Sequence, residues 1–129
     1  MKCSRSRIIR KVHKIPDLRF EDQRMTSYSG LVVFQALFGV LRFKERLRRC
    51  LTHLKESGAY RHEVVALLLV VHLLLGYRRL RDMDYYRGDP MVMRVLGLSR
   101  LPDVSTVSRI LRSTDGQSIL NLRGLCRQR

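Results

Sequence analysis

A stretch near the carboxyl end of the chain holds the residues whose types and spacing best fit a defined chemistry. Small hydroxyl residues are followed by arginines at helical spacing, so a helix there would present them on one side. Hydroxyl groups and a helix amino terminus bind phosphate oxygens, while arginine reaches guanine edges or the phosphate backbone. The candidate nucleic-acid contacts are Arg100 as a phosphate clamp, Ser105, Thr106, Ser108, Arg109 and Arg112.

Two short helices joined by a turn must position these residues. Asp89-Pro90 has the form of a helix start, and Gly97 has the form of a helix stop. Asp103 is placed to cap the next helix, over residues 104–111. This order is typical of a helix-turn-helix, whose second helix enters the major groove of DNA. The alternative is an ordinary amphipathic surface helix with no ligand.

Two further basic segments fit nucleic acid. The first 14 residues contain no acid, and an arm of this kind can follow a minor groove or the DNA backbone. Its candidate contacts are Arg5, Arg7, Arg10 and Lys11. A basic helix face over residues 42–55 is a weaker candidate. Simple solvation is the alternative for both segments.

Catalytic and metal-binding patterns are weaker. Asp82 and Asp84 stand two positions apart, which places them on different faces of a helix, so we expect them to pair with nearby arginines. Cys50 and His53 form only half of a zinc pattern. His72 lies in an apolar run and is expected to be a hydrogen-bonded core histidine. We assign no catalytic residue and no metal ligand.

The charge of the whole chain favours a polyanionic partner. Lys and Arg number 26 against 11 Asp and Glu, which gives a net charge of +15 in 129 residues. Arginine-favouring codons of a GC-rich genome are the alternative explanation. Three scattered cysteines and the lack of a secretory signal indicate a reducing cytosol, and with a DNA partner a place on the nucleoid. The apolar run at 64–75 is shorter than the roughly 20 residues that span a bilayer, so no membrane contact is expected.

The pattern along the chain predicts an all-α fold, a small helical bundle with a helix-turn-helix, preceded by a basic arm or short β-hairpin. We expect the arm over residues 1–22, the helical domain over 23–114 and a tail over 115–129, with at most a frayed helix at 119–125. Thr26 or Ser27 can cap a first helix, and Gly58 ends a second helix over 43–54. Further helices are expected over 62–75, 79–87, 90–96 and 104–111, of which the first is buried.

The order of several segments resembles the amino-terminal part of insertion-sequence transposases of the DDE type. Met25-Thr26-Ser27-Tyr28-Ser29-Gly30-Leu31 is similar to an "LTSYGG" helix start, and Leu75-Gly76-Tyr77-Arg78-Arg79-Leu80-Arg81-Asp82 is similar to an "LGYEDLND" segment. Asp89-Pro90, Val95-Leu96-Gly97 and Ser105-Thr106-Val107-Ser108-Arg109 follow in the order typical of the family. The resemblance covers roughly residues 18–114.

The resemblance implies that the helical region recognises the terminal inverted repeats of the element in double-stranded DNA. It also implies that cutting and joining belong to a following RNase H-like domain, whose three carboxylates bind Mg²⁺. We carry none of those carboxylates onto this sequence, expect no cofactor in this chain, and interpret the chain as a truncated transposase. It is expected to serve in DNA transposition and recombination by binding DNA, and to associate with itself or with the full-length enzyme, which it could inhibit. A stand-alone transcriptional regulator and a non-functional remnant are the alternatives.

Overall fold

The computed structural model describes residues 25–56 and 58–127, and the regular secondary structure of this part of the chain is helical, without a strand. The all-α prediction is confirmed for it. The predicted arm or hairpin, with Arg5, Arg7, Arg10 and Lys11, lies outside the described residues. Six α-helices and one 3-10 helix follow in order: α2 (Leu31–Val40), α3 (Phe43–Leu51), α4 (His62–Leu74), η1 (Leu80–Tyr86), α5 (Pro90–Leu96), α6 (Val104–Arg112) and α7 (Gly116–Arg127).

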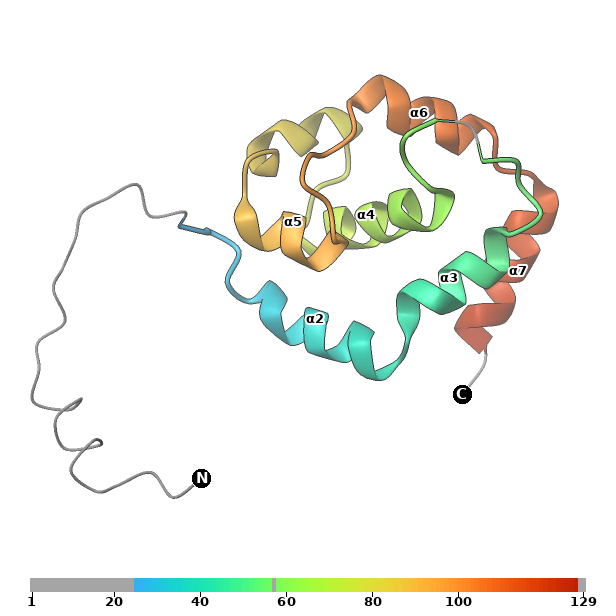
Figure 1. Ribbon diagram of the computed structural model, residues 1–129, viewed down its shortest axis with the longest axis horizontal. Coiled ribbons are helices and arrows are strands. Elements are labelled where there is room, and N and C mark those ends of the chain that lie inside the picture. Colours follow the sequence, from blue (N-terminus) through green and yellow to red (C-terminus); the bar gives the residue numbers. More distant parts are fainter. Residues whose placement is uncertain (1–24, 57, 128–129) are drawn as a thin grey trace, which may run out of the picture.

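Helix α4 lies at the centre of the bundle, and the other elements pack around it (Figure 1). Helices α3, α5 and α6 contact it directly, while α2 packs against α5 and α3, α6 against η1, and α7 against α3. The sequence of α4 explains its place, because a helix that is apolar on nearly every side is stable only when it is surrounded. The prediction of a buried central helix is confirmed.

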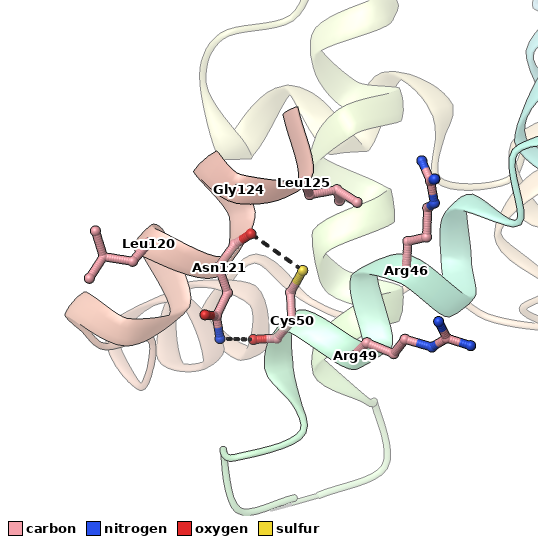
Figure 2. A pocket seen from close by; sticks show the side chains of 7 residues that line it. All are labelled: Arg46, Arg49, Cys50, Leu120, Asn121, Gly124 and Leu125. Carbon is pink, nitrogen blue, oxygen red and sulfur yellow. Dashed lines mark hydrogen bonds between the residues drawn. The ribbon is translucent and has the colours of Figure 1, made fainter. Parts of the chain in front are cut away.

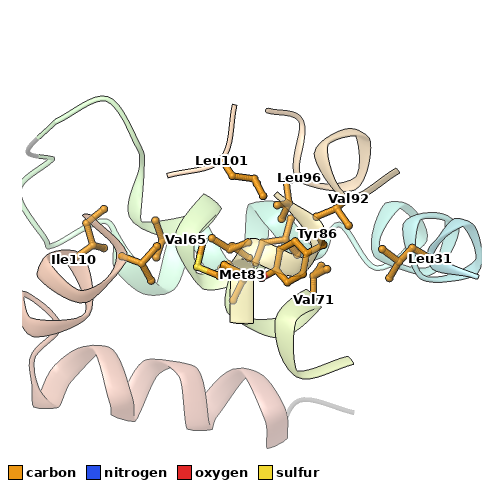
Figure 3. Packing of buried hydrophobic residues seen from close by; sticks show 13 residues of the cluster. Leu31, Val65, Val71, Met83, Tyr86, Val92, Leu96, Leu101 and Ile110 are labelled. Carbon is orange, nitrogen blue, oxygen red and sulfur yellow. The ribbon is translucent and has the colours of Figure 1, made fainter. Parts of the chain in front are cut away.

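One continuous hydrophobic core joins the elements, from Leu31 on α2 to Ile110 on α6 (Figure 3). Leu68 and Val71 of α4 are fully buried, and so are Leu96 of α5 and Val107 of α6. Burying a leucine-sized side chain stabilises the fold by about 1.5–3 kcal/mol. Both short helices of the predicted helix-turn-helix are therefore anchored in the core.

The ends of α5 follow the local sequence signals. The Asp89 carboxylate accepts hydrogen bonds from the backbone N–H groups of Met91 at 2.9 Å and Val92 at 3.2 Å. Gly97 ends the helix in the left-handed conformation, with φ of 68°, which a residue without a Cβ adopts easily. Both predicted boundaries are confirmed.

Other boundaries differ from the prediction. Thr26 caps no helix; its hydroxyl group donates to the Asp89 carboxylate at 2.7 Å, and α2 begins only at Leu31. Helix α3 ends at Leu51, so Gly58, with φ of 106°, lies in the loop before α4. The segment expected to be a tail is a full helix from Gly116 to Arg127.

A sharp turn between α2 and α3 was also not predicted. Arg42, the residue before α3, has φ of 48°, and it is the only described residue other than glycine with a positive φ. A left-handed conformation costs a residue with a Cβ roughly 1–2 kcal/mol. The turn sets α3 at an angle to α2, and α3 packs against α4 (Figure 1).

Candidate nucleic-acid interface

Helix α6 separates its buried and exposed sides as the sequence predicted. Val107 is fully buried and Ile110 is 5% exposed, so one side is sealed against the core. On the other side Ser105, Arg109 and Arg112 are exposed, and this exposed side is available to a ligand. The remaining candidates of α6 are half-buried: Thr106 and Ser108.

The turn before α6 is fixed from two directions. Leu101 and Pro102 are buried and anchor it to the core. The Tyr60 hydroxyl group, from the loop before α4, donates to the backbone carbonyl of Arg100 at 3.2 Å. The Arg100 side chain is exposed, so the predicted phosphate clamp is held by its backbone while its guanidinium group faces solvent.

The amino terminus of α6 carries no side-chain cap. Asp103 occupies the predicted cap position, but its side chain makes no cap hydrogen bond. Its carboxylate accepts from Arg87 Nη1 at 3.1 Å, and Arg87 also donates to Asp84 at 2.9 Å. These contacts raise the pKa of Arg87, chiefly through the Asp84 hydrogen bond. The first N–H groups of α6 therefore lack a side-chain acceptor, and the nearby acid is balanced by a cation.

Among the described residues, the arginines on α6 and in the turn before it have no acidic partner. Within residues 25–56 and 58–127, ion pairs engage Arg49, Arg61 and Arg87, but not Arg100, Arg109 or Arg112. The Arg109 guanidinium group lies beside the loop before α4, where a Cβ at Gly58 would come 3.7 Å from it. The positive charge of α6 is therefore not cancelled by neighbouring carboxylates.

A second basic surface lies on α3. An open groove of about 520 Å³ separates α3 from α7, and Arg46 and Arg49 line its α3 side. Two hydrogen bonds join α3 and α7 at the floor of the groove. Asn121 Nδ2 donates to the Cys50 carbonyl at 3.0 Å, and Cys50 Sγ donates to the Asn121 carbonyl at 3.6 Å. Figure 2 shows both guanidinium groups turned away from Asn121. Sequence reasoning missed this groove because it placed a tail where α7 lies.

The residues weighed for catalysis serve the fold. Asp84 pairs with Arg87, as predicted for a surface acid, and Asp82 accepts from the Arg79 backbone N–H at 3.3 Å. His72 is buried and both of its nitrogens are hydrogen-bonded, as predicted. His53 contacts Asp115 at 3.0 Å. In the described part of the chain, no three His, Cys, Asp or Glu residues gather as a metal site would require.

No helix within the described ranges is both long and apolar enough to cross a membrane. A family model described as transposase DDE domain group 1 matches residues 10–128. The match includes all seven described helical elements and part of the preceding basic segment. Comparison with curated proteins and with solved structures gives no match.

Proposed function

This chain belongs to the DDE transposase family. We propose that its helices bind double-stranded DNA as part of DNA transposition, and that α6 enters the major groove. One observation carries the proposal. Arg109 and Arg112 stand exposed and without carboxylate partners among the described residues, on a helix whose other side is sealed in the core. A groove-binding helix needs this combination of fixed position and free positive charge.

The proposal gives each candidate residue a role. Arg109 and Arg112 reach guanine edges or phosphates, and Arg100 clamps a phosphate from the turn. Ser105, Thr106 and Ser108, together with the uncapped amino terminus of α6, bind backbone phosphate oxygens. Helix α5 and the turn act as the supporting half of a helix-turn-helix. The basic arm stays a predicted second contact, along the minor groove or the backbone.

The partner that we propose is the set of terminal inverted repeats of an insertion sequence, bound at the nucleoid. The carboxylates of the described residues do not fit the Mg²⁺ site expected of the family, because Asp82 and Asp84 are engaged in separate local contacts. We therefore derive no cutting or joining step from these residues. Association with itself or with the full-length enzyme stays a prediction.

A binding assay tests the proposal. Fluorescence anisotropy at moderate salt compares the DNA ends that flank the gene with shuffled duplexes of the same composition. The unmodified chain should prefer the flanking ends. Arg109→Ala should weaken that binding by roughly 1–3 kcal/mol, the usual contribution of one good arginine contact to a base.

Arg123→Ala is the matched control, because it removes the same charge from an exposed position of α7. It should leave the preference for the flanking ends unchanged. Equal affinity of the unmodified chain for flanking and shuffled duplexes would contradict the proposed recognition.

A further inference from the structure

The aromatic ring of Tyr85 is displayed on the surface of η1. Its side chain is 73% exposed, which is unusual for a large aromatic residue. One face of the ring stacks on Tyr77, with centroids 5.6 Å apart and planes inclined by 13°. The opposite face of the Tyr85 ring is left in solvent, so the stacked pair has one open aromatic face.

The Tyr77 ring is held rigidly by its neighbours. The Tyr77 and Tyr28 hydroxyl groups are hydrogen-bonded at 2.8 Å, and the Tyr77 ring packs near His72 and Tyr86, with centroids 5.6 and 5.7 Å away. The bond to Tyr77 and burial raise the pKa of Tyr28 to about 12. The Tyr28 hydroxyl group therefore stays protonated near neutral pH, and its hydrogen bond holds the Tyr77 ring in place.

Three exposed cations follow Tyr77 in the chain: Arg78, Arg79 and Arg81. None of them is in an ion pair within residues 25–56 and 58–127. The neighbouring acids are engaged, because Asp82 accepts from the Arg79 N–H and Asp84 is held by Arg87. An open aromatic face, with exposed arginines close to it in the chain that form no ion pair among the described residues, is a combination with which proteins hold single-stranded nucleic acid.

The same element is joined to the helix that the proposed function places in the major groove. Helix α6 packs against η1, and Arg87 at the end of η1 bonds Asp103 at the start of α6. DNA bound by α6 would therefore have η1 as its neighbour.

We propose that Tyr85 stacks on an unpaired nucleobase of DNA, with the adjacent arginines binding its phosphates. This inference rests on the proposed DNA binding and adds a preference for duplexes that end in, or contain, unpaired bases. A protein partner is the competing occupant, but three unpaired cations favour a polyanion over an apolar protein surface.

The test uses the full 129-residue chain and two DNA probes. One is a blunt duplex and the other is the same duplex with a single-stranded adenine overhang that carries 2-aminopurine. The unmodified chain should bind the overhang probe about tenfold more tightly, the size of one base–aromatic stack, and should quench the 2-aminopurine fluorescence. Tyr85→Ala should abolish both effects without changing affinity for the blunt probe.

Two control variants define the result. Tyr85→Phe keeps the ring and should retain the preference and the quenching. Leu73→Ala truncates another exposed apolar side chain, 65% exposed at the end of α4, and should also retain both. Loss of the preference in either control, or its survival in Tyr85→Ala, would overturn the inference. So would a self-association of the chain that Tyr85→Ala abolishes.

The two proposals fail in different ways. If α6 does not bind duplex DNA, affinity for the blunt probe is absent or insensitive to Arg109→Ala, whatever the overhang adds. If Tyr85 is no stacking site, blunt binding persists and the overhang gives no advantage.

Discussion

At the scale of single residues, the pair of His72 and Tyr86 shows how the core accommodates polar atoms. His72 Nε2 lies 3.1 Å from the Arg79 carbonyl, which can only accept, so this nitrogen carries the hydrogen. The Tyr86 hydroxyl group can then donate to His72 Nδ1, which lies 2.6 Å away. Burial raises the pKa of Tyr86 well above its usual value, so the hydroxyl group remains a donor.

We expect Tyr86→Phe to destabilise the protein by about 1–3 kcal/mol, because it leaves His72 Nδ1 buried without a donor. Urea denaturation followed by far-UV circular dichroism measures this change. Tyr85→Phe removes the same atom from an exposed ring and should change the free energy of unfolding by less than about 0.5 kcal/mol. Equal stability of the two variants would contradict the role of the buried bond.

The sequence predicted the environment of a residue where its contact partner is close in the chain, or where the neighbouring residues are uniformly apolar. The run of apolar residues around His72 predicted its burial, and the arginines near Asp84 predicted that it would pair with one of them, which the structure identifies as Arg87. The identity of the His72 partner was not predictable, because the chain must first turn at Gly76, with φ of 87°, to bring Tyr86 back.

At the scale of elements, local signals decided which helix boundaries could be predicted. Asp89 and Gly97 act on their own helix, and both boundaries are confirmed. Thr26 was wrongly taken as a cap because its partner, Asp89, lies 63 positions away in the chain. Asp103 stands at the predicted position, but competition from Arg87 directs its carboxylate away from the helix.

Helix α7 is the element that sequence reasoning most underestimated. Its stability depends on α3: Asp115 accepts from the Ser118 N–H at 2.8 Å and contacts His53 Nε2 at 3.0 Å, next to the end of α3. Asn121 adds a bond to the Cys50 carbonyl. A short polar sequence with weak periodicity gives no sign of such contacts, because they exist only after α3 is in place.

The pH dependence of stability should reveal this contact. The hydrogen bond from His53, followed by those from Ser118, holds the pKa of Asp115 well below its usual value of 3.8. A carboxyl group with a lowered folded-state pKa contributes stability that is fully present above the unfolded value and lost as the pH falls through the folded one. We expect the melting temperature of Asp115→Asn to fall less than that of the unmodified chain below about pH 4.

Glu45→Gln is the control for this measurement, because it removes an exposed carboxylate whose one ion pair among the described residues is with Arg49 on the same helix. Its acid dependence should follow that of the unmodified chain. Parallel curves for Asp115→Asn and the unmodified chain would show that the Asp115 contact does not stabilise the fold.

At the scale of the whole molecule, the excess of positive charge sets how DNA binding responds to salt. The logarithm of the affinity for duplex DNA should fall linearly with the logarithm of the salt concentration, and each lost phosphate contact should reduce the slope by about 0.9. We expect this reduction for Arg112→Ala, measured by anisotropy over a salt series. Arg123→Ala, which removes an exposed charge from α7, should leave the slope unchanged.

A slope that stays the same in Arg112→Ala would exclude this residue from the phosphate contacts. The whole-molecule features that could be predicted are those that follow from the pattern of apolar residues, namely helical content and a buried α4, and from composition, namely a positive surface. The groove between α3 and α7 could not be predicted, since packing between distant helices depends on the turn at Arg42 and on α7.

The tyrosine cluster gives the molecule a built-in optical probe. The chain has no tryptophan and five tyrosines, and four of these, Tyr28, Tyr77, Tyr85 and Tyr86, are packed together where the segment before α2 meets α4 and η1. The near-ultraviolet circular dichroism of the protein should therefore come mainly from this tyrosine cluster, at the junction of α4, η1 and the segment before α2. Assembly of the junction can thus be monitored separately from helix formation, without introducing any label.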